Sequence, residues 1–310
     1  MVDVLRRVFL PLARMVVTVF LVATISFVVV RVIPGDPAVV IAGIDASPDR
    51  VDSIRRELGT DRPMYTQYGE WLSGLAVGDF GESLARNRSV SRMIAERIPV
   101  TLTLAGAAFL ITLVLSIPLG LRAAVHPNGP TDRLLGVFSH VGLAIPDFWV
   151  GIILLLIFAV GLRALPLFGA STVRHFVLPA VALAMSRAAL LARVVRASVR
   201  AELQRPYIDG IRARGVSAAR LMLRHVLPNA LLPVITVAAV QLGYLLGGAI
   251  IIEQVFSMPG LGRLILSAVF QRDFPVVQAG VMFIAVCFSA INFFADLLYG
   301  LADPRVRRGS

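Results

Sequence analysis

The sequence contains no lysine, so all 30 of its basic residues are arginine. A phosphate-binding Walker loop needs a lysine to hold the β- and γ-phosphates of a nucleotide. The chain therefore has no Walker A site, and any ATP hydrolysis linked to it must take place on another protein. Cysteine is nearly absent as well. The single one, Cys287, lies inside an apolar run, which excludes an intrachain disulfide and a cysteine metal cluster.

Charge of either sign is also scarce. Charged residues make up 16% of the 310 positions, against about 25% in soluble domains, whereas 57% are hydrophobic and the mean hydropathy is +0.81. A water-soluble protein of this size could not bury so much apolar surface in one core, but a bilayer could accept it. The formal net charge of +11 does not indicate a nucleic-acid partner, because the arginines are segregated between apolar runs. The composition predicts an integral membrane protein.

Six apolar runs reach the length of about 20 residues that a spanning helix requires. The first is too long for the apolar region of a signal peptide and no small-x-small cleavage site follows it, so we interpret it as a retained anchor within residues 1–33. The third and sixth are long enough to tilt or to end outside the bilayer. The predicted spans are Leu10–Val32, Val100–Leu121, Leu134–Val160, Phe176–Val195, Ala230–Ile252 and Val276–Leu301.

Arginine counts in the connecting segments predict the orientation. With the N-terminus inside, the inner segments carry 15 arginines, counted with Arg193 at the inner end of the fourth span and the three of the tail at 302–310 (Arg305, Arg307 and Arg308), and the two short outer loops carry 4. Cytoplasmic loops of membrane proteins hold such an excess of basic residues. Both termini are therefore expected on the cytoplasmic side of the membrane.

The segment at 34–99, between the first two spans, is expected outside the membrane as short helices. Ser47 is a candidate N-cap, with Pro48 at the first helical position and Gly59 as a stop. A second helix would place aromatic and leucine side chains on one face, either at the level of the lipid headgroups or in a small packed cap. These side chains are Tyr65, Tyr68, Trp71, Leu72 and Leu75.

The inner segment at 196–229 carries the clearest local signals. Pro206 can open a short helix and Gly215 can end it, which predicts a helix at Pro206–Arg214 with Tyr207, Ile208 and Ile211 on one face. Ser217 can cap a second helix that runs towards Leu227-Pro228, where the fifth span begins. Such a helix–glycine–helix unit between two spans would form a rigid lever with an exposed knob. The alternative is a solvated basic loop that only fixes topology.

Two charges lie near the middle of predicted spans. Asp147 is about midway along the third and Arg187 about midway along the fourth, so both are expected near the bilayer centre. Intramembrane charges usually face a bundle interior or a partner. The two could pair as a structural salt bridge, or could line a path that suits a peptide zwitterion. Pro146 removes a helical hydrogen bond beside Asp147 and predicts a kink or break. Glu253 opens an expected outer loop that could touch a partner, gate the path or only turn the chain.

At the inner segment the sequence resembles the binding-protein-dependent permeases of ABC importers. Their cytoplasmic loop carries Glu-Ala-Ala, three residues, Gly, nine residues, Ile, one residue and Leu-Pro. Here Asp209-Gly210-Ile211 stands at Glu-Ala-Ala, Gly215 at the glycine and Leu227-Pro228 at Leu-Pro, while both alanines are replaced and His225 stands at the isoleucine.

Longer stretches narrow the resemblance to the first permease subunit of the dipeptide, oligopeptide and nickel group, over nearly the whole chain. They are RVIPGDPA (31–38), ELGTDRPMYTQY (57–68), GDFGESL (78–84), ERIPVTL (96–102), IPDFW (145–149), GGAIIIEQVFSMPGLGRL (247–264), DFPVVQAG (273–280) and DLLYGLADPRVR (296–307).

The resemblance implies an all-α, type I ABC importer permease fold with its core at 100–301. It also implies a related second permease subunit, two ATPases on the inside that bind ATP and magnesium, and an extracytoplasmic binding protein. The inner helix would sit in a cleft on one ATPase, and Asp147, Phe148, Arg187 and Glu253 are assigned to the translocation path. The assigned coupling residues are Arg205, Tyr207, Ile208, Asp209, Gly210, Ile211, Arg212, Gly215 and Ser217.

The resulting function is ATP-driven import of di- or oligopeptides across the cytoplasmic membrane, with a nickel chelate or a glutathione-like compound as alternative cargo. An ion-coupled secondary transporter would show inverted repeats and central carboxylates, and an intramembrane enzyme would show a nucleophile–base pair or a zinc motif. Neither pattern occurs. His140, His175 and His225 lack ligand spacing, so no catalytic or metal site and no cofactor is assigned to this chain. A purely structural anchor would leave the inner knob without a role.

Overall fold

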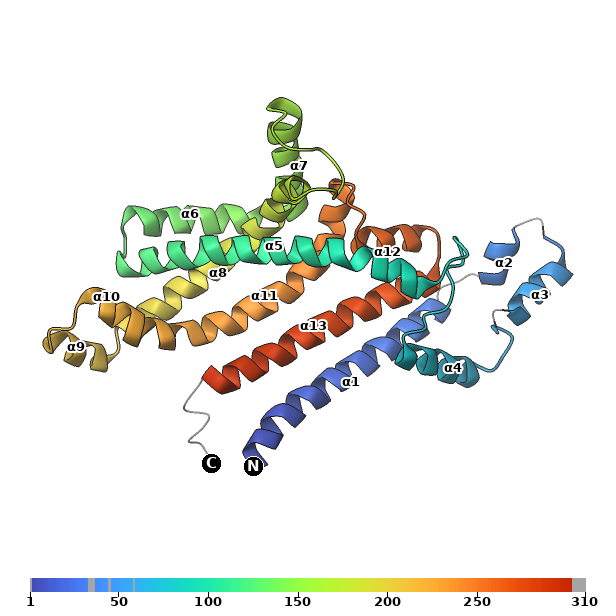
Figure 1. Cartoon of the computed structure of the whole chain (residues 1–310), viewed down its shortest axis with the longest axis horizontal. Helices are drawn as coiled ribbons and strands as arrows, with labels where there is room; N and C mark the ends of the chain where they lie inside the picture. The colour runs from blue at the N-terminus through green and yellow to red at the C-terminus, as the bar shows by residue number, and fades with distance from the viewer. Residues whose placement is uncertain (1, 33–36, 44–45, 58, 303–310) are drawn as a thin grey trace.

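The computed structural model describes residues 2–32, 37–43, 46–57 and 59–302, and within these ranges every regular element is a helix (Figure 1). Residues 33–36, where the first span meets the outer segment, and the tail arginines Arg305, Arg307 and Arg308 lie outside the described residues. In chain order the helices are α1 (Val2–Val32), α2 (Pro37–Ala42), α3 (Pro48–Glu57), α4 (Met64–Val77), α5 (Val90–Val125), α6 (Pro130–Ala144), α7 (Asp147–Leu154), the π-helix η1 (Leu155–Gly161), α8 (Arg174–Leu203), α9 (Pro206–Ala213), α10 (Ala218–Leu221), the π-helix η2 (Met222–Val226), α11 (Leu227–Val255), α12 (Leu261–Phe270) and α13 (Phe274–Ala302).

Five helical stretches of the described chain are long and apolar enough to cross a bilayer. A sixth span results if α6 and α7–η1 count as one. This agrees with the expected number of about six. The five stretches are Val8–Val32, Val90–Val125, Arg174–Leu203, Ala218–Val255 and Phe274–Leu297.

The third expected span is broken. Its halves, α6 and α7–η1, meet at 101°, and α7 projects away from the bundle in Figure 1. Ile145, between them, is extended (φ −95°, ψ 125°). Proline disfavours helical backbone in the residue before it and has no N–H to donate, so Pro146 ends the first half and begins the second. The predicted break at Pro146 is confirmed, and Leu134–Val160 is not one straight helix.

Helix α5 begins earlier than the second expected span. It starts at Val90 and runs through Pro99, whereas the sequence suggested an outer segment as far as residue 99. An interior proline removes one backbone hydrogen bond, and this helix continues across the loss. Val90, Met93 and Ile94 are buried against α12 and α13, which holds the extra turns in place.

The centre of the molecule is the packing of α8 along α5. Ala188, Ala189 and Ala192 of α8 are fully buried. A Cβ on Gly120 of α5 would lie 2.5 Å from the Ala192 carbonyl oxygen and 2.7 Å from Val195 Cβ, so only glycine permits this approach. Small residues are the usual means by which membrane helices pack closely. The α5–α8 pair forms a stiff core, to which α11 and then α13 and α1 are added (Figure 1).

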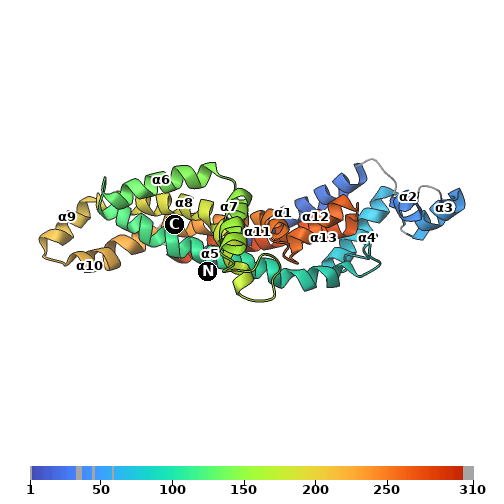
Figure 2. The ribbon, with the colours of Figure 1, turned by 90° about the horizontal axis from the view of Figure 1, so that it is seen from above.

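The short helices lie at opposite ends of the long axis, with α9 and α10 at one end and α2 and α3 at the other (Figures 1 and 2). The expected start of α3 at Pro48 is confirmed, and Gly59 follows its end with φ +66°. In α4, Tyr68 and Trp71 pack against Phe27 of α1, with ring centroids 5.0 and 5.5 Å away. Tyr65, expected on the same face, is 79% exposed in the first turn.

Candidate coupling and translocation site

Helix α9 has the limits that its sequence suggested. Arg205 is extended (φ −71°, ψ 137°), Pro206 occupies the first turn, and the helix ends at Ala213 with Arg214 as its C-cap. Gly215 then adopts φ +72°, a conformation that costs a residue with a Cβ about 1–2 kcal/mol. No atom lies within 4 Å of the position a Cβ would take there, so the reason for glycine is backbone conformation and not crowding.

Ile208 anchors α9 to the body of the protein. It is 0% exposed, and it belongs to a cluster with Val199 of α8, Leu221 of α10 and Val226 of η2. Ile211, one turn later, packs partly buried against the same cluster. Ile208 and Ile211 of the expected apolar face therefore point inward, whereas Tyr207 is 41% exposed. The helix is a docked unit and not a solvated loop.

The hydroxyl of Tyr207 connects three elements around α9. It donates to Glu202 Oε1 of α8 at 2.5 Å, it lies 3.2 Å from the carbonyl oxygen of His225, and it accepts from Asn229 Nδ2 of α11 at 3.3 Å. Burial, and then the hydrogen bond to Glu202, raise the pKa of the Tyr207 phenol above its ordinary value. The phenol therefore stays protonated at neutral pH and can donate to Glu202.

The opposite face of α9 is free to meet a partner. Asp209, Gly210 and Arg212 are exposed, and Arg212 Nη1 lies 3.4 Å from Asp209 Oδ1. Arg205, just before the helix, is 3.4 Å from Glu202 Oε2. An exposed helical face on a buried base can transmit a push as one rigid body. Ser217 takes the N-cap position of α10 in extended conformation, but its side chain makes no capping hydrogen bond.

Asp147 and Arg187 come together as expected. Arg187 Nη2 lies 3.8 Å from Asp147 Oδ2, and both side chains are partly exposed. Ser186 Oγ donates to Asp147 Oδ1 at 2.6 Å. The Arg187 guanidinium carbon is 5.5 Å from the ring centroid of Tyr244 on α11, within cation–π range. Phe148, next to the pair, is 37% exposed.

Glu253 corrects the sequence interpretation. It does not open a loop; it lies in the last turn of α11 and is 0% exposed. Its carboxylate accepts from Thr101 Oγ1 of α5 at 2.5 Å and from the backbone N–H of Arg263 at 2.9 Å, and Thr101 Oγ1 accepts from Leu261 N at 2.8 Å. A buried carboxylate needs such donors, and they come from two other helices. Glu253 therefore joins α5, α11 and α12 from inside, and it does not line a surface of the chain.

A second polar junction gave no signal in the sequence. Ser83, in the loop before α5, donates to Asp273 Oδ2 at 2.5 Å, and Leu84 N donates to Asp273 Oδ1 at 3.1 Å. Asp273, between α12 and α13, is 1% exposed. The two partners are 190 positions apart, and no local spacing connects them. Among the described residues, no three His, Cys, Asp or Glu side chains gather as metal ligands would.

Comparison with known proteins agrees with this geometry. The family model described as "Binding-protein-dependent transport system inner membrane component" matches residues 116–308, and the corresponding N-terminal model matches residues 2–105. A putative peptide transport system permease protein of Brucella abortus (strain 2308) is 39% identical over 312 residues, which cover 98% of each chain. The glutathione transport system permease protein GsiC of Escherichia coli (strain K12) is 38% identical over 296 residues, 96% of this chain and 97% of that protein.

The fold has a solved counterpart. A chain of the MetNI methionine ABC transporter superposes with a TM-score of 0.57 at 18% identity, covering 68% of this chain and 96% of that chain. At this identity the likeness concerns the fold alone, which is the all-helical ABC importer permease fold. On the family match and on relatives that span almost its whole length, the chain belongs to the binding-protein-dependent inner membrane transport components, the permease subunits of ABC importers.

Proposed function

We propose that this chain is one of two related permease subunits of an ATP-driven peptide importer in the cytoplasmic membrane, with both termini on the cytoplasmic side. The observation that carries the proposal is α9, which is anchored by a fully buried Ile208 and presents Asp209, Gly210 and Arg212 outward. Membership in the family implies ATPase partners and a binding protein. The absence of lysine excludes a Walker loop in this chain, so ATP and magnesium bind to the partners.

In this mechanism, α9 occupies a cleft on one of two ATPases. Closure of the ATPase pair moves α9 and the elements to which it is fixed. The Tyr207 hydroxyl links it to the ends of α8 and α11, so both long helices receive the displacement. Packed helices are bistable and not continuously deformable, and the displacement therefore favours one of two discrete packings, open to one side or the other. This chain supplies the path and the coupling surface, and we assign it no catalytic group.

The cargo is inferred from chemistry and from relatives. Asp147 and Arg187 place opposite charges side by side, which suits the two charged ends of a peptide. One relative bears a peptide name, and another transports glutathione, itself a small peptide-like acid, so a glutathione-like cargo is the second candidate. The same test distinguishes two further alternatives, which are a nickel chelate as the cargo and an ion-coupled mechanism without ATPases.

The test is reconstitution of the chain with a second permease, the ATPases and the binding protein in liposomes. We expect ATP-dependent uptake of radiolabelled dialanine or a longer peptide. Uptake of glutathione alone would move the assignment to the second candidate, and uptake of a nickel chelate alone would contradict both. Peptide uptake that follows a proton or sodium gradient, in liposomes without ATPases, would contradict the importer mechanism. The Asp209→Ala variant should lose uptake, whereas the exposed Arg92→Gln variant at the far end of α5 should retain it.

A further inference from the structure

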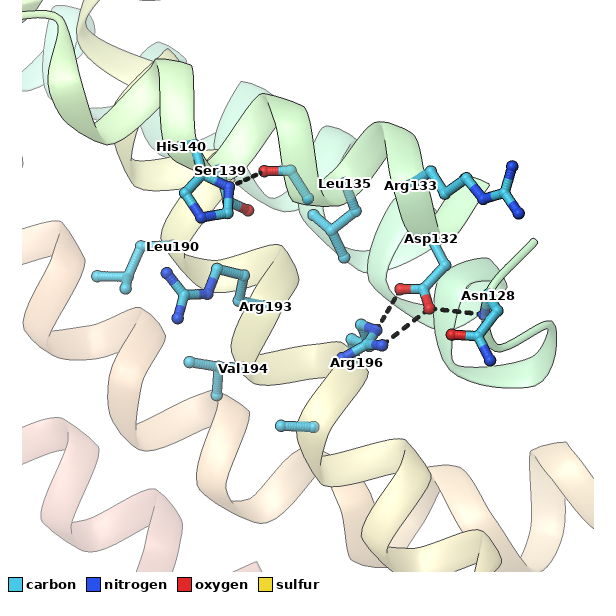
Figure 3. A pocket seen from close by; sticks show the side chains of 12 residues that line it. Asn128, Asp132, Arg133, Leu135, Ser139, His140, Leu190, Arg193, Val194 and Arg196 are labelled. Carbon is cyan, nitrogen blue, oxygen red and sulfur yellow. Dashed lines mark hydrogen bonds and ion pairs between the residues drawn. The ribbon is translucent and has the colours of Figure 1, made fainter. Parts of the chain in front are cut away.

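A pocket of about 800 Å³ lies between α6 and α8, towards the end of the molecule that carries α9 (Figures 1 and 3). Its volume falls in the range of small-molecule sites, about 300–1,000 Å³. Apolar side chains alternate there with polar and cationic ones. The residues that line the pocket include Asp132, Ser139, His140, Leu190, Arg193 and Val194.

At the mouth of the pocket, the charges satisfy one another. Arg196 Nε lies 2.5 Å from Asp132 Oδ1, and Arg196 Nη2 donates to Asp132 Oδ2 at 2.8 Å. Asp132 Oδ2 also accepts from the backbone N–H of Asn128 at 2.9 Å. This paired, hydrogen-bonded arrangement is the geometry of a strong structural contact. Asp132 and Arg196 therefore fix the α5–α6 turn against α8 and leave no charge over for a ligand.

Arg193 differs from this pair. It projects from α8 into the same space as the ring of His140 from α6 (Figure 3). It is exposed, and within the described part of the chain no hydrogen bond or ion pair involves its guanidinium. Asp132, the acidic residue of the pocket lining, is already paired with Arg196. The positive charge of Arg193 thus has no acidic partner among the described residues, and it lies in the pocket between α6 and the membrane-spanning helix α8.

We do not expect the side of α8 that bears Arg193 to contact lipid. Other parts of α8 are packed, with Ala192 against Gly120 of α5 and Ala189 against Gly142 of α6. An arginine within a span is costly against lipid, and such residues face water-filled cavities or partners. Arg193 lines the pocket, so its guanidinium has such a space beside it.

Helix α8 also carries Arg187. It precedes Arg193 by six residues, which is about 9 Å along the helix axis, and the two residues lie about 120° apart around the helix. Arg187 keeps unused donors. It is 3.8 Å from Asp147, longer than a hydrogen bond, and its buried Nε has no hydrogen-bond partner among the described residues. Asp147 is in turn held by Ser186 at 2.6 Å. Arg187 and Arg193 are thus two cations of α8 at successive depths, of which Arg193 is nearer the α9 end and lines the pocket.

We infer that the α6–α8 pocket is a carboxylate site on the inner half of the translocation path, in which Arg193 binds the C-terminal carboxylate of a peptide. The inference rests on the proposed function and names the group that the path recognises. A guanidinium binds a carboxylate through two parallel hydrogen bonds. A single guanidinium at an exposed position holds a carboxylate weakly enough for the cargo to leave, as conduction requires.

The experiment uses the assembled transporter in inside-out vesicles. It takes advantage of the fact that this chain has a single cysteine, which one substitution removes. With Cys287→Ala as background, Ala197→Cys places a reporter thiol in the pocket, on an exposed position of α8 one turn from Arg193. We follow the modification rate of this chain by a water-soluble, anionic methanethiosulfonate reagent. We expect dialanine to slow modification several-fold and dialanine amide, which lacks the carboxylate, to leave the rate unchanged. Adding Arg193→Gln should abolish protection by dialanine while modification continues, whereas Arg92→Gln should preserve protection.

Each contrary result is distinct. Equal protection by dialanine and its amide would overturn the carboxylate assignment. A reporter thiol that only a membrane-soluble reagent reaches would assign the pocket to lipid, and one that no reagent reaches would assign it to the second permease. ATP-driven release of dialanine is measured in the same vesicles, whose lumen is loaded with dialanine and the binding protein. If release is present and protection is not, the inference alone fails; if release is absent, the proposed function fails and the inference falls with it.

Discussion

Truncation of Ile208 to alanine removes most of the contact that holds α9 on the protein. Ile208 is the fully buried residue of α9, and a buried isoleucine contributes about 1.5–3 kcal/mol by its apolar area. Core truncations to alanine cost about 2–5 kcal/mol. The helix has 8 residues, and an isolated helix of that length is not stable in water. A loss of about 2 kcal/mol would raise the undocked population of α9 roughly thirtyfold.

Two assays follow that population. Hydrogen exchange at the backbone amides of α9 should accelerate, and the number of peptides imported per ATP hydrolysed should fall, because a loosely held helix moves without displacing α8 and α11. Leu223→Ala is the matched control: Leu223 is 66% exposed on η2, and its truncation should change neither quantity. Faster exchange in Ile208→Ala together with an unchanged transport-to-ATP ratio would refute the reasoning that α9 must be rigidly docked.

Three further sets of substitutions test other parts of the account. Gly215→Ala forces a residue with a Cβ into φ +72° and should lower the free energy of unfolding by about 1–2 kcal/mol and weaken coupling. Gly210→Ala, in open space on an exposed helix, should instead raise the free energy of unfolding by up to about 1 kcal/mol. Equal thermal midpoints of the two variants would contradict this. Single charge reversals at Asp147 or Arg187 should abolish uptake and the double reversal should restore part of it, measured in cells with equal expression; no recovery would argue against pairing. Glu253→Ala leaves buried donors unpaired and should lower stability by about 1–3 kcal/mol for each, seen as a lower melting temperature in detergent; an unchanged melting temperature would exclude the buried junction.

Features set by neighbouring residues could be predicted from the sequence. Pro206 and Gly215 mark the limits of α9 because proline fits the first turn of a helix and glycine readily adopts positive φ after the last. The break at Pro146 follows in the same way from the missing N–H. The Asp147–Arg187 contact could also be foreseen, since two charges at mid-span in antiparallel helices lie at similar depth.

Features set by tertiary structure could not be predicted. The partners of Glu253, Thr101 and Arg263, come from helices on either side in sequence, and Thr101 is 152 positions away. Without them, a carboxylate near a Pro-Gly sequence resembles an exposed loop residue. The 101° angle at the α6–α7 break depends on what α7 packs against, and not on Pro146 alone. That Arg193 has no ion-pair partner among the described residues could be recognised only once the structure showed Asp132 paired with Arg196.

The central claim is that α9 contacts an ATPase on the cytoplasmic side. The most direct measurement places a cysteine at Asp209, whose side chain is 79% exposed, in the Cys287→Ala background, and treats the assembled complex with a short bifunctional crosslinker. We predict a crosslinked product that contains this chain and an ATP-hydrolysing subunit, with a yield that changes when ATP is bound. Failure to capture an ATPase, or labelling of the same cysteine by an impermeant reagent added outside intact cells, would contradict the account.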